Sequence, residues 1–247
     1  MLGWFKRTAA SDTGIAPALK VDLHSHLIPG IDDGAKTLEE SLALIRRMVD
    51  LGYAKLILTP HVMRDAYHNT PETIIDGLER LREAVREAEI DVVLEASAEY
   101  YLDEGFLPLL EAGKILPIAG KYLLFETSYL AHPNNLLDMI YAIKLHGYSP
   151  ILAHPERYRY IKDPQQEYGE LKELEVLFQI DTTSLGGYYG KDAKKKAEFL
   201  LKEGWIDFVG SDAHRMRHLD QLDAVLHTPK IWTKMLSRNT LRNNTLV

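Results

Sequence analysis

The stretch Val21-Asp-Leu-His-Ser-His26 begins as a short strand of alternating apolar and polar residues and ends in two histidines. Residues i and i+2 of a strand lie on one face, so His24 and His26 can reach a single metal ion. Taken alone, such a pair is more often two ordinary surface histidines. The distant stretch Phe208-Val-Gly-Ser-Asp-Ala-His214 has the same form, because an apolar strand there ends in Asp212 and His214. The repetition favours a metal site at the ends of strands.

Strand and helix patterns alternate along the rest of the chain. The expected strands cover residues 20–24, 55–59, 92–98, 122–125, 149–153, 177–180 and 205–210. The helices between them carry apolar stripes at helical spacing and are expected to begin at about residues 38, 71, 104, 133, 164 and 191. Two further helical segments close the chain. Alternation of this kind implies parallel strands covered by outer helices.

Seven strand–helix units are enough for the sheet to close, and 247 residues fit a single α/β barrel. An open doubly wound sheet is the alternative, although the lack of a glycine-rich loop after the first strand disfavours its nucleotide-binding versions. We therefore predict one (β/α) domain over residues 20–247. Residues 1–19 are expected to form a leader that packs on the surface of this domain, with docking of Trp4 and Phe5 on a partner or a membrane surface as the alternative.

The composition limits the class of protein. Hydrophobic residues make up 46% and charged residues 26%, which are globular values. The net charge of −7 argues against a nucleic-acid partner, and the absence of cysteine excludes thiolate chemistry. No apolar run approaches the ~18 residues of a membrane span, and the start lacks a signal peptide's apolar region. We therefore expect a cytoplasmic enzyme. The run Lys194-Lys-Lys196 is expected to be a solvated helix face.

Side chains that bind metals recur at the carboxyl ends of the expected strands, which form the active face of a (β/α) barrel. Any one of them could be an ordinary buried acid or a histidine bonded to a carbonyl, but a chance scatter would place several on helices. These residues are His24, His26, His61, Glu99, Glu126, His154, Asp212 and His214. Asp33, in the loop after the first strand, is a further candidate ligand, and Asp32 is its competitor.

The types of ligand indicate the chemistry. Imidazole mixed with carboxylate suits Mn, Fe or Zn. So many ligands exceed the needs of one ion, but three ions could share them if Glu99 bridges two. Clustered divalent ions activate water and offset charge at phosphorus. Arg157, three residues after His154, could grip phosphate oxygens, with a structural salt bridge as the alternative. We therefore predict metal-dependent hydrolysis of a phosphate ester.

These motifs resemble the polymerase and histidinol phosphatase (PHP) family. The similarity is greatest to the manganese-dependent protein tyrosine phosphatases of bacterial capsule and exopolysaccharide loci. It covers about residues 20–247, and the leader departs from it because many relatives begin almost at the first strand. The segments that carry it are Leu23–Gly34, Ile57–His61, Phe125-Glu126, Ala153–Arg157, Ser211–His214 and Leu241–Leu246.

The resemblance implies a distorted (β/α)7 barrel of the TIM-like PHP fold that holds three divalent ions, with Mn expected first and Fe or Zn as alternatives. The first ion would be bound by His24, His26, Glu99 and Asp212. The second would be bound by Glu99, Glu126 and His154, and the third by Asp33, His61 and His214. Arg157 matches the family's phosphate-binding arginine. The family has a second such arginine, and Arg215 and Arg217 are both candidates for it.

The resemblance also implies hydrolysis of phosphotyrosine by metal-activated water, with a bacterial tyrosine kinase of polysaccharide export as the partner. Aromatic residues near the strand ends could flank the substrate ring; they are Tyr67, Tyr100, Tyr101, Tyr188 and Tyr189. Three alternatives stay open: a histidinol-phosphate or other small phosphomonoester phosphatase, an amidohydrolase-type metallohydrolase, and a non-enzymatic adaptor stabilised by metals.

Overall fold

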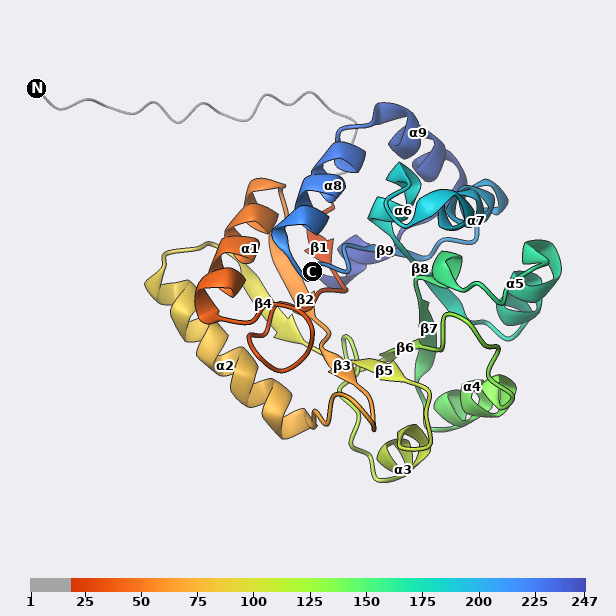
Figure 1. Ribbon diagram of the computed structural model, residues 1–247, viewed down its shortest axis with the longest axis horizontal. Helices are drawn as coiled ribbons and strands as arrows, with labels where there is room; N and C mark the ends of the chain where they lie inside the picture. Colours follow the sequence, from red (N-terminus) through yellow and green to blue (C-terminus); the bar gives the residue numbers. More distant parts are fainter. Residues whose placement is uncertain (1–18) are drawn as a thin grey trace, which may run out of the picture.

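The strands form a ring with the helices around its outside (Figure 1). This computed structural model describes residues 19–247, so the expected leader lies outside the described residues except for Leu19, which is buried. All pairings between the named strands are parallel. The strands are β1 (Val21–Asp22), β2 (Lys55–Leu58), β3 (His61–Val62), β4 (Val93–Ala96), β5 (Glu99–Tyr101), β6 (Tyr122–Glu126), β7 (Ser149–Ala153), β8 (Leu177–Asp181) and β9 (Phe208–Gly210).

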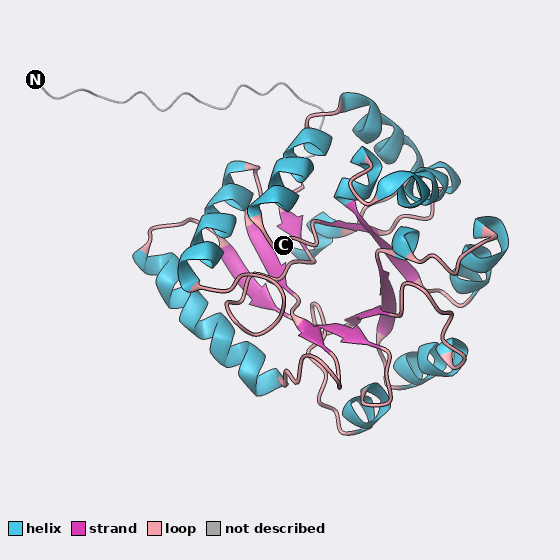
Figure 2. Ribbon diagram, viewed as in Figure 1, coloured by secondary structure: helices cyan, strands magenta, loops and turns pink. Residues whose placement is uncertain are grey.

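Two sheets make up the ring, in the orders β1-β2-β4 and β3-β5-β6-β7-β8-β9. Only Thr59-Pro60 separates β2 from β3, and only Ser97-Ala98 separates β4 from β5, so each pair is one interrupted strand. Beyond β1 and β9, Asp212 donates its backbone N–H to the His24 carbonyl at 2.9 Å, and Ser25 forms a parallel bridge with Ala213. The expected distorted (β/α)7 arrangement is confirmed, and Figure 2 shows its strands inside its helices.

The helices follow the strands in the expected order. They are α1 (Leu38–Asp50), α2 (Pro71–Glu87), α3 (Phe106–Glu111), α4 (Leu136–Leu145), α5 (Pro164–Glu173), α6 (Thr182–Gly186), α7 (Gly190–Glu203), α8 (Met216–Leu226) and α9 (Pro229–Arg238). Short 3₁₀ turns occupy Pro155–Arg157 and Asn243–Leu246. The sequence did not predict α6, because its Thr-Thr-Ser start has low helix propensity. No helix described within residues 19–247 is long and apolar enough to cross a membrane.

Two apolar clusters hold these layers together. The larger one lies between the strands and the helices, and the smaller one includes the strand residues Leu23, Leu124 and Phe208. The smaller cluster also contains Leu246, and the carboxyl terminus lies within the ring in Figure 1. Burial on both faces explains why the strands are nearly continuous apolar runs.

The expectation of a fully solvated Lys194–Lys196 face was wrong for its last residue. Lys196 is buried, and its Nζ donates to the Tyr158 carbonyl at 2.7 Å and to Asp192 Oδ2 at 2.8 Å. Lys195 is exposed, as expected. One lysine of the run therefore ties α7 to the segment that follows β7.

Candidate metal centre

All the sequence-predicted ligands meet at the carboxyl ends of the strands. A cavity of about 420 Å³ is lined by most of them and by Arg157. His24 and His26 are fully buried, and their ring nitrogens contact the lining residues Glu99 and Asp212. The ligands that line the cavity are Asp33, His61, Glu99, Glu126, His154, Asp212 and His214.

The first predicted group has closely converging donor atoms. The Nε2 atoms of His24 and His26 lie 3.2 Å apart. Asp212 Oδ1 lies 3.3 Å from His24 Nε2 and 3.2 Å from His26 Nε2. Glu99 Oε2 lies 3.3 Å and 3.5 Å from the same two atoms. Two ligands at about 2.1 Å from one ion lie about 3 to 3.4 Å apart, so these four side chains are spaced like ligands of a common cation.

The second and third groups converge in the same way. His154 Nε2 lies 2.9 Å from Glu99 Oε1 and 3.8 Å from Glu126 Oε2. Asp33 Oδ1 lies 3.2 Å from His214 Nε2 and 3.5 Å from His61 Nε2. His61 Nδ1, however, lies 3.0 Å from Glu99 Oε2 and 3.2 Å from Glu126 Oε1. His61 therefore stands between the second and third groups.

Hydrogen bonds behind the cluster fix which nitrogen of each inner histidine faces it. Gln179 Nε2 donates to the Ile180 carbonyl at 2.8 Å, which leaves its Oε1 to accept from His24 Nδ1 at 2.7 Å. His26 Nδ1 donates to Asp32 Oδ2 at 2.8 Å. Each Nε2 thereby faces the cluster, and in the neutral ring it is the atom that can bind a metal ion. Asp32 thus orients His26, whereas Asp33 lines the cavity.

Several cluster atoms are buried without a hydrogen bond in the described part of the chain, namely Glu99 Oε2, Asp33 Oδ1 and His61 Nδ1. Leaving such atoms unsatisfied is costly, and a cation between them would satisfy them. The donors are imidazoles and carboxylates, which suit divalent ions. The residues present therefore fit the divalent metal ions expected from the sequence.

The shifted pKa values within the cluster also indicate that it attracts cations. Burial lowers the pKa of His24, but the carboxylates of Glu99 and Asp212 outweigh burial and raise this pKa to about 10. Burial likewise opposes ionisation of Glu99, yet His24 and His61 hold its pKa well below the usual range. The carboxylates thus attract positive charge strongly, whether it is carried by protons or by metal ions.

Two of the cluster residues have strained backbones. His154 and Asp212 have φ values of 34° and 45°, in the left-handed region that residues with a Cβ seldom adopt. Each stands just after a strand, β7 or β9, where the chain turns toward the cavity. Strain of this kind is concentrated at functional sites.

Arg157 lies beside the cluster between two aromatic rings. Its guanidinium carbon is 4.9 Å from the ring centre of Tyr129 and 4.1 Å from that of Tyr189. One nitrogen donates to Asp212 Oδ2, which leaves further donors on the guanidinium. Both the expected phosphate contact and the alternative of a salt bridge are thus compatible with this position. Neither Arg215 nor Arg217 lines the cavity.

The tyrosine predictions were partly wrong. Tyr67 and Tyr101 line the cavity, and Tyr67 stacks on His61 with ring centres 5.4 Å apart. Tyr100 instead is buried and accepts a hydrogen bond from the Leu116 N–H at 2.7 Å, so it is a core residue. Tyr129 was not predicted from the sequence, because it lies beyond the end of a strand in a loop without a motif.

Comparisons with known proteins agree with this site. Residues 20–235 match the family described as capsular polysaccharide synthesis, CpsB/CapC. The tyrosine-protein phosphatase YwqE of Bacillus subtilis (strain 168) is 30% identical over 198 residues, which cover 80% of this chain and 78% of that protein.

Solved structures show the same relation. A structure from a study of YwqE of Bacillus subtilis and CpsB of Streptococcus pneumoniae, described as unique metal-dependent tyrosine phosphatases, superposes with a TM-score of 0.77 and 28% identity. The superposition covers 90% of this chain and 96% of the solved chain. The phosphotriesterase homology protein of Escherichia coli, at 15% identity, covers 92% and 95% of the two chains with a TM-score of 0.55 and shares the fold alone. The chain therefore belongs to the CpsB/CapC family of capsular polysaccharide synthesis.

Proposed function

We propose that this protein is a metal-dependent protein-tyrosine phosphatase that hydrolyses phosphotyrosine with an activated water. The observation that carries the proposal is the convergence of four overlapping groups of metal-ligand atoms at one cavity, beside Arg157. The similarity to YwqE, which is named a tyrosine-protein phosphatase, supports the choice of substrate.

The proposed ligands are the nine residues predicted from the sequence, with Glu99 shared between two ions. When bound, divalent ions would supply an activated water and offset negative charge on the phosphoryl group. The chain itself holds the ligands in place, since Gln179 and Asp32 fix the rings of His24 and His26. Such partners raise the basicity and the precision of the ligands.

Arg157 would bind two oxygens of the phosphate. The rings of Tyr129 and Tyr189 hold the plane of its guanidinium, so less entropy is lost when it binds. A contact of this kind stabilises charge that develops on the equatorial oxygens.

The cavity offers a place for an aryl group, and no aliphatic hydroxyl among its described lining residues is hydrogen-bonded to a histidine or a carboxylate. Tyr67 and Tyr101 line it and would flank the ring of the substrate. Among the described lining residues only Ser128 has an aliphatic hydroxyl, and its Oγ accepts from the N–H groups of Leu130 and Ala131 in a turn. A phenolate, whose conjugate acid has a pKa of ~10, is a fair leaving group.

We further propose a cytoplasmic location and a tyrosine kinase of polysaccharide export as the physiological partner. The description of the family as one of capsular polysaccharide synthesis supports this partner. Mn is the ion that we expect first, since the ligands are hard oxygens and imidazoles without sulfur.

The test compares kcat/KM of the Mn-loaded protein on a phosphotyrosine peptide, the matching phosphoserine peptide and histidinol phosphate. We expect the phosphotyrosine peptide to give the highest value. If histidinol phosphate exceeds it by tenfold or more, the tyrosine phosphatase assignment must be abandoned.

A further inference from the structure

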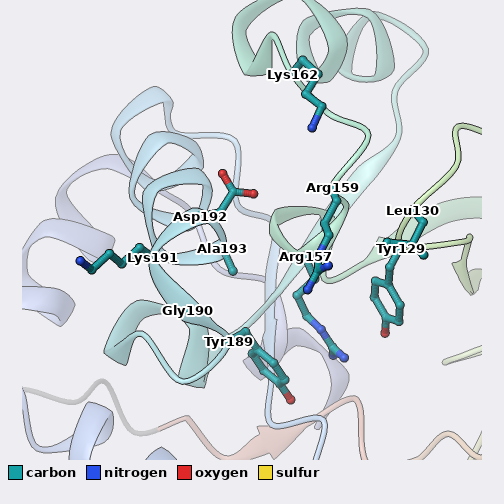
Figure 3. Close-up of a pocket in the computed structure, with 10 residues that line it drawn as sticks. All are labelled: Tyr129, Leu130, Arg157, Arg159, Lys162, Tyr189, Gly190, Lys191, Asp192 and Ala193. Carbon is teal, nitrogen blue, oxygen red and sulfur yellow. The ribbon is translucent and has the colours of Figure 1, made fainter.

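A second cavity, of about 780 Å³, adjoins the candidate metal centre (Figure 3). The two cavities share Tyr129, Leu130 and Arg157 as lining residues. The remaining walls of the second cavity come from Arg159 and Lys162, between β7 and α5, and from the start of α7. A ligand whose phosphate contacts Arg157 can therefore continue directly into the second cavity.

This second cavity is positively charged, although the whole chain has a net charge of −7. Arg159 and Lys162 are exposed, and neither forms an ion pair with any acid in the described residues. In Figure 3 Arg159 extends toward Arg157, whereas Lys191 points away from it. The acid among the lining residues, Asp192, is paired with Lys196 at 2.8 Å. The free charge of the cavity is therefore cationic.

The segment that carries Arg159 is held in place by the wall that both cavities share. The N–H of Arg159 donates to the Tyr129 carbonyl at 2.7 Å. The opposite wall is the first turn of α7, a helix of 14 residues whose N-cap residue, Tyr189, makes no capping bond with its side chain. The first N–H groups of a helix lack partners within it and favour anions. The helix start thus adds to the attraction that Arg159 and Lys162 exert.

We propose that this cavity binds a second anionic group of the substrate peptide, either an acidic side chain or a second phosphate, close to the phosphotyrosine. The inference rests on the proposed function, which places the reacting phosphate at Arg157. A peptide must leave the smaller cavity on at least one side of the phosphotyrosine, and each residue spans at most ~3.6 Å. The shared wall offers the peptide a route on which Arg159 and Lys162 meet an anion.

The experiment uses the Mn-loaded full chain and phosphotyrosine peptides of equal length. In one series all flanking residues are alanine; in the others a glutamate, or a second phosphotyrosine, is moved stepwise along both sides. We expect kcat/KM for the best anionic peptide to exceed that of the alanine peptide on the order of tenfold, and this preference to shrink as salt is added. The glutamate and phosphotyrosine series distinguish the two sources of the anion.

Charge-reversal variants test whether Arg159 and Lys162 cause the preference for anionic peptides. Arg159→Glu and Lys162→Glu should each reduce the preference for the anionic peptide, and the double variant should abolish it. Lys195→Glu changes the net charge equally but lies on the exposed side of α7 outside the cavity, so the preference should persist. If the Lys195 variant loses the preference as fully as the other two, the effect is long-range and the proposal is overturned.

Measurements of peptide binding test the anion-binding cavity independently of the proposed phosphatase activity. The dissociation constants of peptides that carry a non-hydrolysable phosphotyrosine analogue are measured for the same variants. Charge-dependent binding without hydrolysis of any phosphotyrosine peptide would support the cavity and overturn the proposed function. Hydrolysis with equal binding of neutral and anionic peptides would overturn the cavity and leave the proposed function intact.

Discussion

Two side chains behind the cluster decide where the inner histidines point. Gln179 and Asp32 accept from the Nδ1 atoms of His24 and His26, and neither lines the cavity. The sequence predicted both histidines from their spacing along a strand. It could not choose between Asp32 and Asp33, because adjacent residues of an irregular loop have no fixed period. Gln179 lies on β8, far from His24 in sequence, so no local motif marks it.

The hydrogen bond between His24 and Gln179 gives a first prediction. Gln179→Leu should leave the fold intact and weaken metal binding about 10- to 100-fold, because His24 loses the acceptor that fixes its ring. Competition with a chromogenic chelator measures the affinity. Gln179→Glu keeps an acceptor at the same place and should recover most of the loss. Equal affinities for wild type and the leucine variant would show that Gln179 does not position His24.

Arg157 gives a second prediction at the same scale. Arg157→Ala should lower kcat/KM by about 10²-fold, since one preorganised contact to the developing charge is lost, while the metal content stays unchanged. Arg157→Lys should recover little, because an ammonium cannot form the same fork between the rings of Tyr129 and Tyr189. Loss of metal from the alanine variant would instead assign Arg157 a structural role through its pairing with Asp212.

At the scale of secondary-structure elements, the interruptions in the strands bring His61 and Glu99 side by side. Pro60 has no N–H to donate, and it separates β2 from β3. The chain then resumes with His61 paired to Glu99, and the Glu99 N–H donates to the Pro60 carbonyl at 3.1 Å. The apolar runs predicted these strands and their order. The interruptions depend on pairing between strands that are distant in sequence, so the local pattern did not reveal them.

The packing of β9 against β8 gives a third prediction. A Cβ on Gly210 would lie 2.6 Å from Gln179 Nε2 and 2.8 Å from His24 Cβ. Gly210→Ala should therefore destabilise the fold by about 1–3 kcal/mol and weaken metal binding, because His24 must shift. Denaturant unfolding and chelator competition measure the two effects. Gly169→Ala on α5 is the control, since its nearest non-local neighbour would be 3.8 Å away. It should not destabilise the fold, and the better helix propensity of alanine should add up to ~1 kcal/mol of stability.

On the scale of the whole molecule, the carboxyl-terminal segment completes the ring. Asn243 Nδ2 donates to the carbonyls of Val21 and Val209, and Asn243 Oδ1 accepts from the Val209 N–H. One buried side chain thus joins β1 to β9 at the end of the ring opposite the metal centre. The resemblance singled out Leu241–Leu246, but only the fold shows that this segment links the first strand to the last.

This link gives a fourth prediction. Asn243→Ala leaves three buried backbone groups without their partner, so it should cost about 3 kcal/mol or more in the free energy of unfolding. The neighbouring variant Thr245→Ala is a control, because the Thr245 hydroxyl is exposed and bonds to the nearby Arg242 carbonyl. If the two variants unfold at the same denaturant concentration, Asn243 does not hold the ring closed.

The metal ions couple the whole ring to the candidate centre, since their proposed ligands come from six of its seven strand positions and the loops that follow. Protein purified without chelator should contain about three divalent ions, and chelation should lower Tm because ions that bind only the folded state stabilise it. Glu99→Ala should retain about one ion and no activity, since Glu99 contacts His24 of the first ligand group and His154 of the second. Elemental analysis counts the ions, and circular dichroism checks that the variant is folded. A folded variant that keeps all of its ions would show that Glu99 bridges nothing, and the three-ion proposal would then have to be replaced by separate sites.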